Sequence, residues 1–274
     1  MFEFLLALDF DGVLCDGLQE YFWVAWRTYC VLEIDRNCSV RQPPPQEKFG
    51  IFSRCRAVIE TGWEMPLLIH ALQQERSEAE ILDRWSEIVK ELQASAEIPS
   101  AKILAAQLDQ IRDRWIEEDL SGWLALHRFY PGVLSWLQTL LAKEQPIAIV
   151  STKEGRFINQ LLSQSGINFP SNLIFGKEVK QPKSETLRQL ITAYPHLNSI
   201  CFVEDRLATL QSVKAASDLQ NVQLFLADWG YNTPQDRSQA TQDDRIQRLS
   251  LDDLAQEWGV GSVLAPNPKR LAPR

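Results

Sequence analysis

Two aspartates, Asp9 and Asp11, stand one residue apart directly after an apolar run, in the stretch LLALDFDGVLCDG (residues 5–17). A carboxylate can attack phosphorus and so divide a difficult hydrolysis into two easier displacements. A second carboxyl two residues further on in a turn can reach the other side of the reacting phosphorus, protonate the leaving oxygen and later activate water. The stretch therefore predicts a nucleophile at Asp9 and a general acid/base at Asp11.

Hydroxyl, lysine and carboxylate side chains follow three later apolar runs: Ser151 and Thr152, then Lys177, Lys180 and Lys183, then Glu204 and Asp205. Carboxylates from two strand ends repel one another unless a cation lies between them, and hard oxygen ligands favour magnesium. Zinc would require His or Cys ligands, and His70, His127 and His196 lie in helical or loop contexts unrelated to these strand ends. The set predicts a site for an oxyanion and Mg²⁺.

The elements that must position these residues alternate between strand and helix. Apolar runs predict strands over residues 4–10, 147–150, 172–175, 199–203 and 222–227, and helical spacing predicts helices over 155–165, 184–194 and 207–216. This alternation is typical of parallel βαβ units, and it predicts an α/β fold with a Rossmann-like, doubly wound parallel sheet. Ligands bind at the carboxyl ends of such strands, so the polar side chains are expected to meet there.

The first strand is separated from the others by a long segment in which we find only helices and loops. Apolar positions recur three and four apart over residues 17–32, 56–74, 77–95 and 100–118. An extended loop at Pro43, Pro44 and Pro45 lies between the first and second of these segments. The sequence therefore predicts a discontinuous core, residues 1–16 and 129–274, with an all-helical domain inserted at 17–128. The proline-containing tail, residues 259–274, is expected to be loose.

Composition limits the class of protein. The formal net charge of −8 over 274 residues, with no basic stripe, argues against nucleic acid as a partner. No run approaches the roughly 20 apolar residues that a membrane span needs. Five cysteines form no CxxC pair, and an odd number fits a disulfide framework poorly, so a cytoplasmic protein is expected.

Four segments in this order, DFDGVLCDG, IAIVSTKEG, GKEVKQPKSETL and FVEDRLATL, resemble the four motifs of the haloacid dehalogenase-like (HAD) superfamily of phosphohydrolases. The resemblance implies that Asp9 is the nucleophile and a Mg²⁺ ligand, and that Asp11 is the acid/base and a ligand through its backbone carbonyl. It further implies phosphate binding by Ser151, Thr152 and Gly12, and Mg²⁺ binding by Asp205 and Glu204. The helical insertion resembles the cap of the subfamily that includes phosphoglycolate phosphatases and β-phosphoglucomutases.

The third motif leaves its lysine open, because the chain offers KQPKSETL where GKPxP is common in the family. Lys183 is preferred, since it opens the predicted helix and would project with the helix N-terminus toward an anion; Lys180 is the close rival. In the helical insertion, Arg56 and Glu60 lie around a loop at Gly62 and could read the leaving group of a substrate, although a solvated helix end is the simpler interpretation.

These expectations combine into a Mg²⁺-dependent phosphatase that acts on a small phosphorylated metabolite. A phosphomutase of the β-phosphoglucomutase type shares all four motifs and differs in presenting a sugar hydroxyl in place of water. A regulatory or binding protein that keeps the phosphate site without turnover is the alternative from another class. Fold-level analogy does not choose among substrates, because one architecture hosts many specificities.

Overall fold

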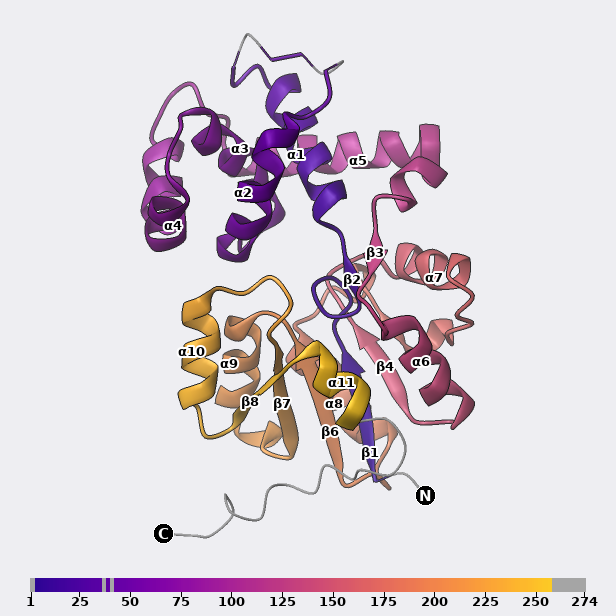
Figure 1. Ribbon diagram of the computed structural model, residues 1–274. Helices are drawn as coiled ribbons and strands as arrows, with labels where there is room; N and C mark the ends of the chain where they lie inside the picture. Colours follow the sequence, from indigo (N-terminus) through magenta and orange to yellow (C-terminus); the bar gives the residue numbers. More distant parts are fainter. Residues whose placement is uncertain (1–2, 36–37, 40–41, 258–274) are drawn as a thin grey trace. The chain divides into compact units, whose positions relative to one another are not determined.

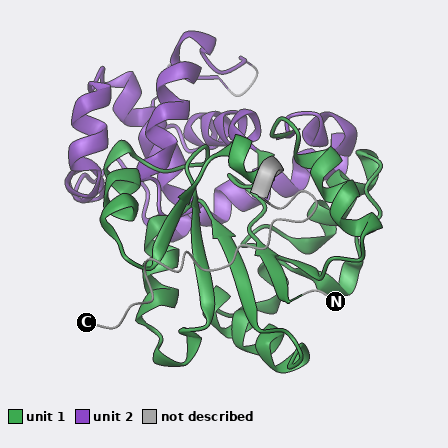
Figure 2. Ribbon diagram, turned by 60° about the horizontal axis from the view of Figure 1, so that its bottom comes forward, with its two compact units in different colours: residues 1–16, 129–274 green, residues 17–128 purple. Residues whose placement is uncertain are grey.

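The computed structural model describes residues 3–35, 38–39 and 42–257, and the predicted tail at 259–274 lies outside them. The chain divides into two compact units: unit 1 comprises residues 1–16 and 129–274, and unit 2 comprises residues 17–128 (Figures 1 and 2). None of the helices in the described ranges combines the length and the apolar character that a membrane crossing requires.

Unit 1 contains a six-stranded sheet with the order β5-β4-β1-β6-β7-β8. All of its pairings are parallel: Leu8 of β1 lies opposite Ile149 of β4 on one side and Val203 of β6 on the other. The strands are β1 (Phe4–Leu8), β4 (Ile147–Val150), β5 (Ile174–Phe175), β6 (Ser199–Glu204), β7 (Val222–Ala227) and β8 (Ile246–Leu249). The predicted α/β fold with a Rossmann-like parallel sheet is confirmed.

Helices flank this sheet because its central strands are apolar on both sides. Leu5 and Ala7 of β1 belong to a buried cluster on one face, which includes residues of α8 (Lys183–Ala193), α9 (Leu207–Ala215) and α10 (Pro234–Gln242). The crossovers through α6 (Val133–Ala142) and α7 (Gly155–Gln164) run in the opposite direction along the sheet, so the right-handed rule places them on the other face. Short elements complete the unit: η4 (Ser171–Leu173), η5 (Lys177–Val179), η6 (Ser217–Leu219) and α11 (Leu251–Glu257).

A separate two-stranded sheet, β2 (Cys15–Asp16) with β3 (Arg128–Phe129), forms where the chain leaves the core and returns to it. Among the described residues of unit 2, the regular elements that lie wholly inside the unit are helical: α1 (Leu18–Val31), η1 (Gln46–Lys48), α2 (Phe49–Cys55), η2 (Arg56–Val58), η3 (Gly62–Glu64), α3 (Met65–Gln73), α4 (Glu78–Gln93) and α5 (Ala101–Leu124).

The middle of unit 2 contains a buried polar group as well as aromatic rings. Helix α1 contacts both α3 and α5, and Glu20 on its first turn is fully buried. Its carboxylate accepts hydrogen bonds from Arg112 Nε (2.8 Å) and Trp123 Nε1 (3.1 Å) of α5. Because a buried carboxylate is costly unless it is paired, these contacts fix how α5 lies against α1.

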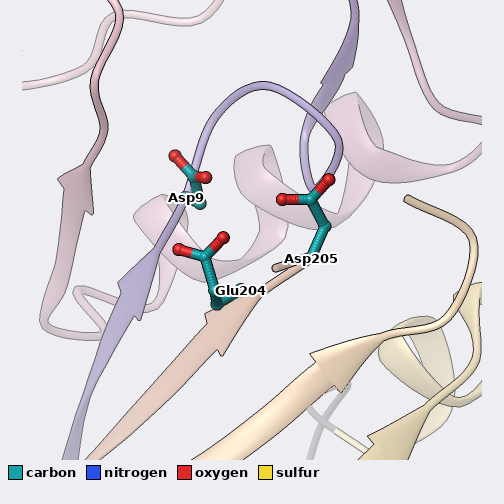
Figure 3. A group of neighbouring side chains, drawn as sticks. All are labelled: Asp9, Glu204 and Asp205. Carbon is teal, nitrogen blue, oxygen red and sulfur yellow. The ribbon is translucent and has the colours of Figure 1, made fainter. Parts of the chain in front are cut away.

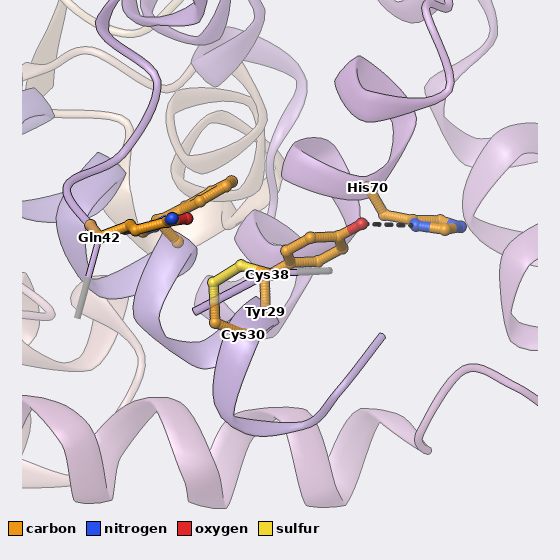
Figure 4. Close-up of a disulfide and its surroundings, with 6 residues drawn as sticks. Tyr29, Cys30, Cys38, Gln42 and His70 are labelled. Atoms are coloured by element: carbon orange, nitrogen blue, oxygen red, sulfur yellow. Dashed lines mark hydrogen bonds between the residues drawn. A yellow bond between two sulfur atoms is a disulfide. The ribbon is translucent and has the colours of Figure 1, made fainter. Parts of the chain in front are cut away.

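A disulfide joins Cys30, at the end of α1, to Cys38, with the Cα atoms 5.1 Å apart (Figure 4). The cysteine spacing led us to expect no disulfide framework, and this single local pairing differs from that expectation. The chain turns back after α1, and this brings two cysteines eight residues apart together. The other three cysteines, Cys15, Cys55 and Cys201, are buried thiols. Next to the disulfide, the Tyr29 hydroxyl makes a 3.4 Å hydrogen bond with His70 Nδ1.

Candidate active site

The predicted nucleophile, Asp9, follows β1 directly, in the middle of the sheet. Its backbone N–H donates to Val203 O (2.9 Å), which extends the ladder to β6 by one step and places Asp9 next to the end of that strand. Glu204 and Asp205 stand at that end. The parallel register therefore brings together carboxylates that are almost 200 positions apart in the sequence.

Asp9, Glu204 and Asp205 form one group, in which a carboxylate oxygen from each residue lies within 4.8 Å of the others (Figure 3). We call these residues the three-carboxylate group. The three are 6%, 0% and 1% exposed, respectively. Buried like charges at this separation are unfavourable unless a cation neutralises them. Because every donor is a carboxylate oxygen, the group fits a hard divalent cation such as Mg²⁺.

Burial dominates the electrostatics of this group. Burial, together with the nearby Glu204 carboxylate, raises the pKa of Asp9 to about 7. Burial and the charge of Asp9 raise the pKa of Asp205 to about 6, and burial also raises the pKa of Glu204. The protein therefore holds these carboxylates where ionisation is unfavourable, which is typical of functional sites.

Lys183, the first residue of α8, reaches into the three-carboxylate group. Its ammonium lies 2.8 Å from Asp9 Oδ2 and 2.7 Å from Glu204 Oε2. Burial by itself lowers the pKa of Lys183, but the two carboxylates more than offset this and raise the pKa above its usual value, so the side chain stays cationic. The rival, Lys180, is exposed just after η5. The structure thus brings Lys183, and not Lys180, to Asp9.

Asp11 lies in a tight turn that follows Asp9. The N–H groups of Leu14 and Cys15 both donate to Phe10 O (2.9 Å each), and Gly12 occupies the left-handed region with φ of 83°. The Asp11 carboxylate makes an ion pair with Lys153 Nζ (3.2 Å) and is not part of the three-carboxylate group. Lys153 was not among the residues predicted from the sequence, although it directly follows the Ser-Thr pair.

Gly12 was predicted to bind phosphate, and its backbone N–H instead donates to Cys15 O (2.9 Å), a bond that would have to open for that role. A Cβ at position 12 would overlap the Asp205 carboxylate. Glycine is therefore needed here both for its backbone angles and for its missing side chain.

Ser151 and Thr152 differ in their surroundings. Ser151 follows β4 and is buried, with its N–H donating to Phe175 O (2.9 Å) and its Oγ accepting from the Lys153 N–H (3.3 Å). Thr152 is exposed. Of the two predicted phosphate donors, Ser151 has the more constrained hydroxyl.

Arg56 and Glu60, predicted to read the substrate, lie in unit 2. Arg56 donates from Nη1 to Ile59 O (3.1 Å), and its guanidinium stacks over the ring of Tyr21 at 5.1 Å. Glu60 is exposed. The loop between them and α3 is fixed by the buried Glu64 carboxylate, which accepts from Thr61 N (2.8 Å) and from Trp85 Nε1 (2.7 Å). Both specificity assignments stay predictions.

Sequence reasoning missed the loop after β7, residues 228–232, which packs against Asp205. The N–H of Tyr231 donates to Asp205 Oδ2 (2.7 Å), and Asn232 Nδ2 donates to Asp205 O (3.1 Å). The available signal was positional: β7 neighbours β6, so the segment ADWGYN had to emerge beside the Glu204-Asp205 pair.

A cavity of about 630 Å³ in unit 1 lies elsewhere. Its lining includes Ser199, Val222 and Ile246, the first residues of β6, β7 and β8. At roughly 3.3 Å per strand residue, the far end of β6 is about 16 Å away. This cavity is therefore separate from the carboxylates at the other edge of the sheet.

One family model matches most of this chain, and several solved structures share its fold. The family model described as haloacid dehalogenase-like hydrolase matches residues 5–217. A solved structure of a predicted phosphoglycolate phosphatase from Haemophilus somnus is similar, with a TM-score of 0.55 and 19% identity, over 93% of this chain and 97% of that one. No curated protein sequence matches this chain.

Two further solved structures share the fold. A predicted phosphatase from Clostridium acetobutylicum has a TM-score of 0.53 at 13% identity, over 94% of this chain and 98% of that one. A hydrolase from Pseudomonas syringae has a TM-score of 0.53 at 13% identity, over 92% of this chain and 94% of that one. At these identities the likeness concerns the fold alone.

Proposed function

Because the chain belongs to the haloacid dehalogenase-like hydrolase family, we propose that it is a Mg²⁺-dependent phosphatase that hydrolyses a small phosphorylated metabolite through an aspartyl-phosphate at Asp9. The observation that carries the proposal is the position of Asp9: a buried carboxylate at the end of a central strand, paired with Lys183 and adjacent to Glu204 and Asp205. This arrangement combines a nucleophile, a fixed cation and a set of metal ligands in one place.

Each residue then has a role in the reaction. Asp9 attacks phosphorus, the bond from phosphorus to the leaving oxygen breaks, and Asp11 gives that oxygen a proton. In the second step Asp11 takes a proton from water, whose oxygen attacks the phosphorus and releases Asp9. Lys183 balances the charge that spreads over the phosphoryl oxygens, and the hydroxyl of Ser151 donates to one of them.

Asp9, Asp205 and Glu204 would hold the Mg²⁺ ion, with Asp11 contributing its backbone carbonyl. When bound, the ion neutralises part of the charge on the phosphoryl group as a Lewis acid. Lys183 remains between Asp9 and Glu204 and limits how much negative charge these two carboxylates present.

Unit 2 is proposed as the cap that selects the substrate, with Arg56 and Glu60 as the side chains that read the leaving group. Arg56 suits such a role because its guanidinium is held by Tyr21 and the Ile59 carbonyl at a fixed place in the unit. A planar guanidinium recognises carboxylate or phosphate groups in two-pronged contacts. A substrate with an anionic group beyond the scissile phosphate is therefore the expected class.

The test is phosphate release from a panel of phosphorylated metabolites, with Mg²⁺ and with EDTA, for the wild type and for Asp9→Asn. Release that needs Mg²⁺ and disappears in the variant supports the proposal. An Asp9→Asn protein that keeps the wild-type rate would refute the nucleophile. Isomerised sugar phosphate in place of free phosphate would identify a phosphomutase instead.

A further inference from the structure

The loop after β7, residues 228–232, packs against the predicted metal ligand Asp205 and against the turn at Gly12. A Cβ at Gly230 would overlap both Asp205 Cβ and Gly12 O, so the backbone approaches as closely as glycine allows. Asp205 is therefore confined between two glycines, one in each loop. Little freedom remains for its side chain to move.

Asn232 makes the central contacts of this loop. It is 6% exposed, and its Nδ2 donates to Asp205 O (3.1 Å) and to Ala227 O (2.8 Å). Its Oδ1 accepts from Arg237 Nη1 (2.9 Å), which fixes which end of the amide faces Asp205. Both amide protons and the amide oxygen are thus engaged, and the side chain connects the end of β6 to the end of β7.

Tyr231 adds a contact to the carboxylate itself. Its backbone N–H donates to Asp205 Oδ2 (2.7 Å), which fixes the plane of the carboxylate. Its hydroxyl donates to Asp16 Oδ1 (3.0 Å), at the last residue of unit 1 before residues 17–128. Because Asn232 sets the backbone of the adjacent residue, the Tyr231 N–H depends on the same amide for its direction.

We propose that Asn232 is a positioning residue for the metal site: it holds Asp205, directly and through the backbone of Tyr231, in the orientation that a divalent cation requires. This inference rests on the proposed function, because it takes Asp205 as a metal ligand. Hydrogen-bond partners of ligating carboxylates typically change metal affinity 10- to 100-fold when they are removed. Asn232 touches neither the metal nor the substrate in this assignment.

The test is the affinity of the full chain for Mn²⁺, used as a paramagnetic probe in place of Mg²⁺ and measured from the electron paramagnetic resonance signal of the free ion. Asn232→Leu keeps the branching and the number of side-chain heavy atoms and removes both donors, and we expect it to weaken Mn²⁺ binding at least 10-fold. The matched control is Thr233→Val at the next position, which removes the cap of α10, where Thr233 Oγ1 accepts from the Asp236 N–H (3.0 Å). The control is expected to lower the melting temperature and to leave Mn²⁺ affinity within two-fold of the wild type.

The outcomes separate this inference from the proposed function. Equal Mn²⁺ affinity in the wild type and Asn232→Leu overturns the inference, and so does an equal loss in Asn232→Leu and Thr233→Val, which would indicate general loosening. If Asn232→Leu does not fold, Arg237→Met removes the donor that orients the amide, and it must weaken Mn²⁺ binding several-fold for the inference to stand. A wild type that binds no Mn²⁺ and releases no phosphate refutes the proposed function itself.

Discussion

Replacing Asp9 by Asn should abolish turnover and, in the metal-free protein, increase stability. Burial and the Glu204 carboxylate raise the pKa of Asp9 from 3.8 to about 7. Each pKa unit corresponds to about 1.4 kcal/mol, so ionising Asp9 at pH 8 costs the folded protein about 4 kcal/mol relative to the unfolded chain. Asn resembles the protonated, uncharged form of Asp, and it removes this cost.

The increase in stability caused by Asp9→Asn should depend on pH. A carboxyl whose pKa is raised on folding stabilises the native state below its unfolded pKa, and this contribution is lost as the pH rises through the folded pKa. The metal-free wild type should therefore lose stability between pH 4 and about pH 7, and the gain from Asp9→Asn should grow over the same window. At pH 4 we expect a gain of less than about 1 kcal/mol, because Asp9 is partly protonated even in the unfolded chain.

The assay is thermal unfolding in EDTA at pH 4 and pH 8, followed by circular dichroism. At pH 8 a gain of about 4 kcal/mol corresponds to a melting temperature roughly 10 °C higher for a protein of this size. Asp11→Asn is the matched control: its carboxylate pairs with Lys153 and lies outside the three-carboxylate group, so it should lose activity without the pH-dependent gain. Equal melting temperatures of wild type and Asp9→Asn at pH 8 would show that burial and the Glu204 carboxylate do not disfavour the ionised form of Asp9.

Three further predictions follow from the same contacts. Lys183→Met removes the cation between two buried carboxylates. It should abolish phosphate release and lower the free energy of unfolding, measured in urea titrations, by about 3–5 kcal/mol. Lys180→Met, at the exposed rival position, should change neither. Gly12→Ala places a Cβ against the Asp205 carboxylate and should weaken Mn²⁺ binding at least 10-fold, as measured by calorimetry. Unchanged affinity would contradict the close approach of Gly12 to Asp205. Ser151→Ala removes the proposed phosphate donor, which also accepts from the Lys153 N–H. It should raise KM for the best substrate about 10-fold and lower the free energy of unfolding by about 1 kcal/mol. An unaltered KM would exclude Ser151 from phosphate binding.

The central strands could be predicted from sequence because their apolar character is continuous. β4 and β7 have the predicted bounds, Ile147–Val150 and Val222–Ala227, and β1 and β6 differ from prediction only at their ends. Strands buried on both faces show uninterrupted apolar runs, and β4, β6 and β7 each come after a helix with clear apolar spacing. The residues at the ends of these strands, such as Asp9, Ser151 and Glu204, could therefore be located from the sequence as well.

The edge strand β8 could not be predicted in the same way. β8 (Ile246–Leu249) was missed, because Gln247 and Arg248 interrupt it and both are exposed. β8 is an edge strand that pairs only with β7, and its exposed polar residues interrupt the apolar run that marks a buried strand. The pairing of Asp11 with Lys153 and the role of Asn232 were missed for a related reason, since contacts between loops depend on where the strands end in space and leave no periodic signal in the chain.

The three-carboxylate group lies at the carboxyl ends of β1 and β6, where it lowers the stability of the fold. A loss of stability at this place is compatible with a hydrolase. Asp9 and Asp205 are both shifted toward the neutral form by burial, yet the chain keeps them 6% and 1% exposed and uses two glycines to bring Asp205 close. A fold selected for stability alone would place apolar side chains there, because replacing buried charges by well-packed hydrophobic residues is often stabilising. In the proposed phosphatase a bound cation would offset the unfavourable ionisation. The burial and repulsion that are expected to lower the stability of the metal-free protein would then favour Mg²⁺ binding, and the proposed nucleophile would be active only with the metal bound.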